Sequence, residues 1–196
     1  MTHATNAPPA SDRATRFITH LAGLAEREDR AALAALRRGL GRRPGEVADP
    51  CPYVDPWLHD DDPPWVEAAY FTVASLFALH PLVWRRSDAE PTGPRNLGAS
   101  LDRMAPSHDS ARPGVERRFT ALLNCDSEDL PTHLRHAVGL LSAKAVPVDW
   151  ALLLRDVLAW RQPSRRVQRA WARAFWHEPA PSHPSDPPDA ATLPNN

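Results

Sequence analysis

Histidines and cysteines are the residues of this 196-residue chain whose spacing could bind a metal. His133 and His136 lie three positions apart, which places both imidazoles on one side of a helix, where they can share a zinc ion. A third ligand would have to come from elsewhere, and the alternative is a solvated helix face. Cys51 and Cys125 lack CxxC spacing and are expected to be ordinary thiols. We therefore expect no metal and no cofactor.

Two His-Asp dipeptides raise the question of metal-dependent phosphohydrolysis. In helical phosphohydrolases such a pair lies on a buried helix beside further His and Asp ligands, whereas here His59 opens an acidic loop and His108 lies in a loop rich in Pro and Ser. The chain also has no Gly-rich phosphate loop, GxSxG or HExxH motif. We expect no enzymatic activity. A phosphohydrolase that uses His59, Asp60, His133 and His136 is the less favoured alternative.

Basic residues are concentrated in one part of the chain. Residues 112–176 carry eleven Lys and Arg against six Asp and Glu, a net charge of +5, although the whole chain has a formal charge of -1. All 23 basic residues except Lys144 are arginines. A GC-rich genome would produce this bias, and so would selection for guanidinium contacts to phosphate. Because segregated charge creates an electrostatic footprint, the sequence predicts a surface that holds an acidic partner.

Helical apolar patterns run through nearly the whole chain and would position these arginines. The stretch 65–81 is apolar on almost all sides and follows Pro63 and Pro64, which predicts a central buried helix. No stretch shows the period-2 alternation of a strand. The predicted fold class is all-α, with about eight helices in two small bundles. The other helices are expected to begin at Ser11 or Asp12 and at Asp29, and to cover 96–104, 114–124, 130–143, 149–160 and 164–176.

Composition divides the chain into four parts. Residues 1–12 and 177–196 are polar and proline-rich and are expected to be disordered tails. The loop-rich stretch 85–113 contains the expected boundary between an N-terminal helical unit, 13–110, and a C-terminal helical unit, 111–176. Without the tails, 23 basic and 20 acidic residues remain, so the folded part is mildly basic.

The absence of a long apolar run or a signal-peptide pattern leads us to expect a cytoplasmic protein without a membrane partner.

Aromatic residues near the C-terminus have two possible roles. They could stack on unpaired bases, as in proteins that bind single strands, or they could pack in the core. Trp171 and Phe175 follow Val167 at helical spacing, which favours the core, so we do not expect bases to be read. The residues concerned are Trp150, Trp160, Trp171, Phe175 and Trp176.

Seven segments of the sequence occur in an order found in a known family. They are LRRG (36–39), YVDPWL (53–58), the helix over 65–81, NLGASL (96–101), VERRFTALL (115–123), DLPTHLRHAVGLL (129–141) and PVDWALLLRDVLAW (147–160). In this order they resemble the CasB family, the small subunit of the type I-E CRISPR Cascade complex. The resemblance covers roughly residues 13–176. It implies a helical protein without enzymatic activity, two copies of which contact a large subunit and backbone subunits in a ribonucleoprotein.

The resemblance also implies a nucleic-acid interface. In the CasB family a basic face helps to hold the guide-target hybrid and the displaced DNA strand of an R-loop, so CRISPR RNA and the target DNA backbone are the expected partners. The residues predicted to contact nucleic acid are Arg37, Arg38, Arg117, Arg118, Arg135, Lys144, Arg165 and Arg166. Adjacent arginines on a helix diverge by about 100°, so at most one of each pair can face a given phosphate path. The remaining alternative is a helical adaptor whose arginines bind acidic proteins.

Overall fold

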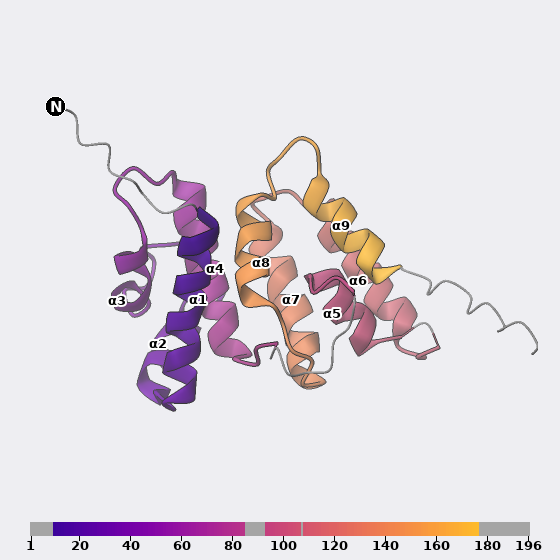
Figure 1. Ribbon diagram of the computed structural model, residues 1–196, viewed down its shortest axis with the longest axis horizontal. Coiled ribbons are helices and arrows are strands. Elements are labelled where there is room, and N and C mark those ends of the chain that lie inside the picture. The colour runs from indigo at the N-terminus through magenta and orange to yellow at the C-terminus, as the bar shows by residue number, and fades with distance from the viewer. Residues whose placement is uncertain (1–9, 85–92, 107, 177–196) are drawn as a thin grey trace, which may run out of the picture.

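The computed structural model describes residues 10–84, 93–106 and 108–176 (Figure 1). The expected tails therefore lie mostly outside the described residues. Within these ranges the protein is helical and has no strand, so the predicted all-α class is confirmed. The helices are α1 (Ala10–Glu26), α2 (Arg30–Arg38), α3 (Cys51–Val54), α4 (Pro64–Leu79), α5 (Leu97–Met104), α6 (Arg112–Asn124), α7 (Leu130–Ala143), α8 (Trp150–Leu158) and α9 (Arg166–Phe175), with a 3-10 turn, η1, over Asp55–Trp57.

Helix α4 forms the centre of the fold. Prolines at the N-cap and first position begin it, because they lack the N–H that a first turn leaves unpaired. Most of its residues are buried, with Tyr70 and Phe77 fully enclosed, and it packs against α2, α7 and α8. The prediction of a central buried helix is confirmed. One strip of α4 departs from this pattern: Trp65 is exposed, and Ala68 and Thr72 are half-buried on the same face.

The two ends of the chain share one hydrophobic core. Figure 1 shows α1 to α4 on the left and α5 to α9 on the right, and α8 contacts both α1 and α4. Helix α5 precedes the expected boundary at residue 110, yet it packs against α9 and α7. This crossing depends on Gly98, since a Cβ atom there would lie 2.1 Å from the carbonyl oxygen of Trp171. A glycine in the NLGASL segment thus lets two backbones touch.

Polar contacts fix the segment after α4 to the loop before α8. The buried His80 ring bonds through Nε2 to the carbonyl oxygen of Val146 at 2.7 Å, and Trp150 Nε1 donates to the carbonyl of Leu82 at 3.2 Å. An isolated parallel bridge joins Val83 to Val148. These contacts orient α8 against α4.

None of the helices in the described ranges is long and apolar enough to cross a membrane.

Candidate nucleic-acid interface

A groove follows the open strip of α4. Trp65, Ala68 and Thr72 recur at helical spacing and form one wall. The wider part has a cavity volume of about 430 Å³ and joins a second part of about 200 Å³ that shares Arg42, Arg43 and Thr72. We call the two parts together the α4 groove. Its other walls come from the loop 39–44, the start of α7 and the end of α8, and its charged lining residues are Arg42, Arg43, Glu128, Arg135 and Arg161.

Two glycines bring the loop 39–44 into this groove. Gly39 ends α2 so close to α4 that a Cβ atom there would lie 2.6 Å from the Ser75 hydroxyl. Gly41 has a φ of 73°, a backbone conformation that residues with a Cβ atom rarely adopt. A Cβ atom at Gly41 would also lie 3.1 Å from the Arg135 guanidinium. The glycines therefore place Arg42 and Arg43 in the groove and leave room for Arg135.

The arginines of the α4 groove form no ion pair through their guanidiniums among the described residues. Their side chains are exposed, and Glu128, which also lines the groove, forms no ion pair with them. Elsewhere in the described ranges, three arginines form ion pairs within the chain. They are Arg13 with Asp62, Arg38 with Asp49, and Arg112 with Asp102 and Glu116. The groove thus holds four guanidiniums, those of Arg42, Arg43, Arg135 and Arg161, whose donors are available to an anion.

Of the predicted contact residues, Arg135 lies in the α4 groove. Arg37 and Arg38 are exposed at the end of α2, where Arg37 Nε donates to the carbonyl of Leu33 and Arg38 pairs with Asp49. Because Arg38 remains 61% exposed, this ion pair is a surface pair that a phosphate can compete with. Of this adjacent pair, Arg38 is the residue that forms an ion pair within the chain.

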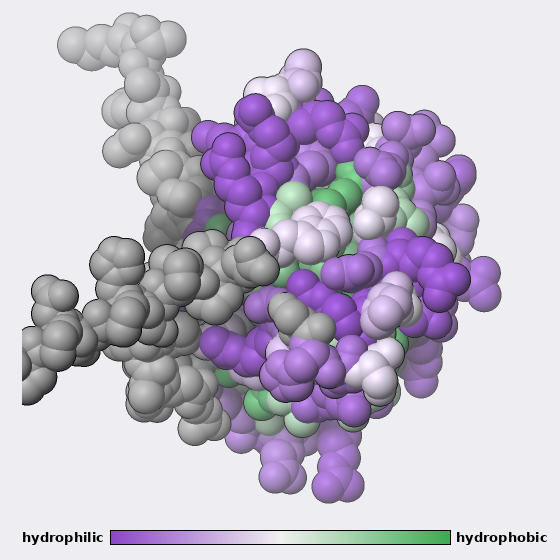
Figure 2. Space-filling model, turned by 90° about the vertical axis from the view of Figure 1, so that its right-hand side faces the viewer, coloured by the Kyte–Doolittle hydropathy of each residue, from purple (hydrophilic) through white to green (hydrophobic). Residues whose placement is uncertain are grey.

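The other predicted residues lie on α6, at the end of α7 and at the start of α9. Arg117, Arg118, Lys144 and Arg166 are exposed. Arg165 has a left-handed backbone with a φ of 47°, and its side chain donates to the carbonyl oxygen of Leu123. Figure 2 shows the end of the molecule that α6 and α9 occupy in Figure 1, where a mainly hydrophilic surface surrounds a small apolar patch.

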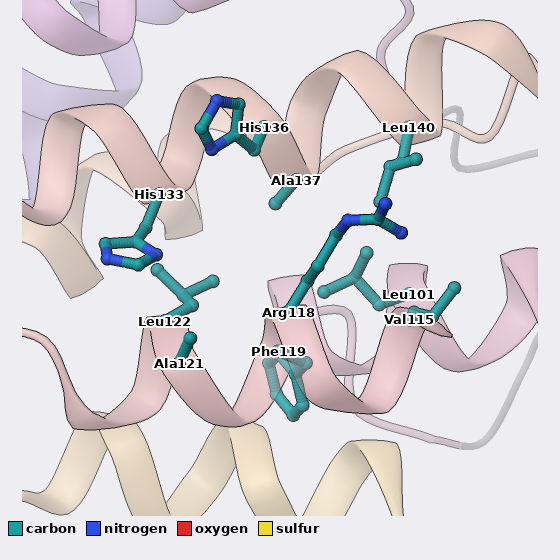
Figure 3. Close-up of a pocket in the computed structure, with 10 residues that line it drawn as sticks. All are labelled: Leu101, Val115, Arg118, Phe119, Ala121, Leu122, His133, His136, Ala137 and Leu140. Carbon is teal, nitrogen blue, oxygen red and sulfur yellow. The ribbon is translucent and has the colours of Figure 1, made fainter. Parts of the chain in front are cut away.

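Arg118 lies in a separate pocket, shared with the two histidines considered as metal ligands. In Figure 3 its side chain reaches from α6 toward Leu140 on α7, and His133 and His136 lie one turn apart on α7. The pocket has a volume of about 160 Å³, and most of its lining is apolar. Across the described ranges, no group of three or more His, Cys, Asp or Glu side chains could hold a metal. His59 and Asp60 are exposed in the loop before α4.

Burial of the aromatic residues confirms the core role expected for Trp171 and Phe175, and Trp150 and Trp160 are buried as well. Trp171 Nε1 donates to the Asp156 carboxylate at 2.6 Å. Burial raises the pKa of Asp156 to about 6, although this hydrogen bond favours the ionised form. The large exposed aromatic residues among those described are Trp65 and Trp176, with 39% and 45% of their surface exposed.

Sequence reasoning missed four residues of the α4 groove: Arg42, Arg43, Arg161 and Trp65. A signal for the first two was present, because the segment GLGRRPG places paired arginines between glycines directly after LRRG. Reasoning from charge also counted Arg112 toward the basic surface, whereas its side chain is buried. Its guanidinium donates to Asp102, Glu116 and the carbonyls of Ala105 and Phe175.

Comparisons with known proteins place this architecture in a family. The pattern that defines the CRISPR-associated protein Cse2 family matches residues 32–176. A CRISPR-associated protein Cse2 from Thermus thermophilus is 36% identical over 149 residues, which cover 74% of this chain and 79% of the relative. The crystal structure of CasB from M. ruber has 33% identity and a TM-score of 0.67, and covers 84% of this chain and 92% of that one. A chain of a CRISPR RNA-guided surveillance complex has 27% identity and a TM-score of 0.68, with the same coverage. The resemblance seen in the seven sequence segments is therefore confirmed, and the chain belongs to the Cse2/CasB family of type I-E Cascade.

Proposed function

We propose that this protein is a non-catalytic subunit of a CRISPR RNA-guided surveillance complex and binds nucleic-acid backbone through the α4 groove. Its partners are CRISPR RNA, target DNA, the large and backbone subunits, and a second copy of the chain. The observation that carries the proposal is the set of four exposed arginines, Arg42, Arg43, Arg135 and Arg161, that line one groove without an ion-pair partner among the described residues. The similar fold of a chain in a surveillance complex supports the assembly.

The function follows from the energetics of the R-loop. The guide-target hybrid is about as stable as the DNA duplex that it replaces, so the exchange is nearly balanced. A few phosphate contacts to the hybrid and to the displaced strand are enough to shift that balance. Guide pairing supplies sequence specificity, and phosphate contacts supply none, so a cluster of arginines suits a subunit that stabilises any target equally.

The other predicted contacts extend this proposal to further surfaces. Arg37, Arg117, Arg118, Lys144 and Arg166 are exposed and keep their predicted role as phosphate contacts. Arg38 and Arg165 keep it as well, with the difference that each must exchange a partner within the chain, Asp49 or the Leu123 carbonyl, for a phosphate. Because the four groove arginines line one groove, we expect them to contribute more to the affinity of the isolated protein than these dispersed residues.

Salt-dependent binding tests the proposal. The full-length protein is titrated against unrelated single-stranded DNA sequences at several salt concentrations. We expect similar affinities for all sequences and a linear fall of log K with log salt, by about 0.7 per phosphate neutralised. Changing Arg42, Arg43, Arg135 and Arg161 to Ala should lower that slope by up to about 3. Target-DNA retention by the reconstituted complex should fall in parallel.

A matched control changes Arg30, Arg169 and Arg173 to Ala, since these arginines are exposed outside the groove. We expect this variant to keep most of the salt dependence, and circular dichroism should show that both variants fold. An absence of salt-dependent binding to DNA would instead favour the protein adaptor, whose arginines bind acidic proteins. Strong preference for one sequence would contradict a backbone-binding role.

A further inference from the structure

Two tryptophans line the α4 groove, of which Trp160 is buried and Trp65 is exposed. It lies in the first turn of α4, behind Pro63 and Pro64, so its backbone belongs to a rigid and well-packed helix. Its side chain is 39% exposed, while Trp150 and Trp171 in the core are fully enclosed. The side chains that follow it on the same face, Ala68 and Thr72, are small and leave open space beside the indole.

Guanidiniums line the same part of the groove as this indole. Arg42, Arg43 and Arg161 line the same part of the groove as Trp65, and all three lack an ion-pair partner in the described part of the chain. An aromatic face beside several cationic groups is the combination by which proteins hold single strands, with the base on the ring and the phosphates on the cations. The cavity of about 430 Å³ lies within the range of about 300–1,000 Å³ of small-ligand sites.

We propose that Trp65 stacks on one unpaired base of the displaced DNA strand while the groove arginines bind the phosphates on either side. This inference rests on the proposed function and names the occupant of the groove. The displaced strand is chosen because its bases are unpaired, whereas those of the guide-target hybrid are occupied by pairing. Stacking uses the face of the base, which all four bases offer, so the site remains independent of sequence.

Abasic DNA separates stacking from phosphate binding. The full-length protein is titrated with a twelve-nucleotide oligothymidine and with the same backbone carrying abasic sites throughout. We expect the wild type to bind oligothymidine about tenfold more tightly than the abasic strand, as for one stacked base. Trp65→Ala should abolish this difference and leave the affinity for the abasic strand unchanged. Trp65→Phe should retain most of the difference, because a smaller aromatic face is still present.

Trp176→Ala is the matched control, since Trp176 is exposed at the end of α9 and does not line the groove. It should keep the tenfold difference. Equal wild-type affinity for the two strands overturns stacking but leaves phosphate binding standing, whereas failure to bind either strand at low salt overturns the proposed function itself. Trp65→Ala that weakens both strands equally would show a structural role instead. Tighter, base-dependent binding to the matching RNA would overturn the assignment to the displaced DNA strand.

Discussion

Arg112 and the arginines of the α4 groove present the same side chain in opposite surroundings. Arg112 is 7% exposed, and its guanidinium donates to two carboxylates and two backbone carbonyls and lies 3.9 Å from the centre of the Phe175 ring. Arg42, Arg43 and Arg161 are exposed around an open groove, and their guanidiniums have no carboxylate partner among the described residues. The Arg112 guanidinium links α5, α6 and α9 inside the protein, whereas the groove guanidiniums are exposed to solvent.

The difference shows that available donors, more than net charge, mark an anion-binding surface. A guanidinium has five N–H donors, and those of Arg112 are directed at groups of its own chain. Arg112 therefore adds to the net charge of residues 112–176 without offering a contact to phosphate. Two of the four groove arginines, Arg42 and Arg43, lie outside that segment, so the most basic stretch of sequence and the basic groove overlap only in part.

Replacing Arg112 should have the largest effect on stability. Arg112→Met removes the donors of two buried carbonyl bonds and two ion pairs, although Asp102 and Glu116 are partly exposed and can be rehydrated. We expect a loss of about 3 kcal/mol in the free energy of unfolding, measured by urea denaturation. Arg117→Met on the same helix is the control and should stay within about 0.5 kcal/mol of the wild type. Equal stability of the two variants would show that the buried contacts of Arg112 contribute no more to folding than an exposed arginine does.

Asp156 should make stability fall as pH rises. Its folded pKa of about 6 exceeds the ordinary value of 3.8, so the folded state binds the proton more tightly than the unfolded state. The contribution of the neutral carboxyl is complete below about pH 4 and is lost as pH rises through 6. Relative to Asp156→Asn, the wild type should lose about 2 kcal/mol between pH 4 and pH 7, measured by urea denaturation. Parallel pH profiles for the two proteins would contradict this.

Gly41 should affect both stability and binding. Gly41→Ala forces a Cβ onto a φ of 73° and toward the Arg135 guanidinium, so we expect a loss of about 1 kcal/mol together with weaker DNA binding. Gly45→Ala is the control, because its φ of 81° imposes the same strain but no atom lies within 4 Å of the new Cβ. It should lose similar stability and keep its affinity. Equal affinities for the two variants would show that Arg135 does not depend on Gly41.

Arg38 and Arg161 give the smallest and most direct comparison of a paired and an unpaired arginine. Arg161→Ala should lower the slope of log K against log salt by about 0.7 with a stability change within about 0.5 kcal/mol. Arg38→Ala removes a surface ion pair, so we expect a similarly small loss of stability and a smaller change in slope, because Asp49 already competes for this guanidinium. A larger slope change for Arg38 would move the interface toward the end of α2.

The sequence predicted the fold better than the groove, for physical reasons. Periodicity and capping are local, so the central helix at 65–81 and the caps at Asp29 and Asp149 could be predicted, and both aspartates accept the expected bonds from Ala32 and Leu152. Which arginine meets a carboxylate is not local. Arg112 meets the Phe175 carbonyl 63 residues away, and Arg13 meets Asp62 across 49 residues. The exposure of Trp65 could not be predicted from the sequence, because it depends on where α7 and the loop 39–44 lie.

The walls of the α4 groove come from both ends of the chain. Helix α4 and the loop 39–44 belong to the first half, and the start of α7 and the end of α8 belong to the second. The proposed binding surface therefore exists only while the two halves are docked through α8, so we expect binding and folding to be linked. Single-stranded DNA at a concentration one hundred times its Kd would raise the free energy of unfolding by about 2.7 kcal/mol. The subunit is thus expected to be more resistant to unfolding when an R-loop is present.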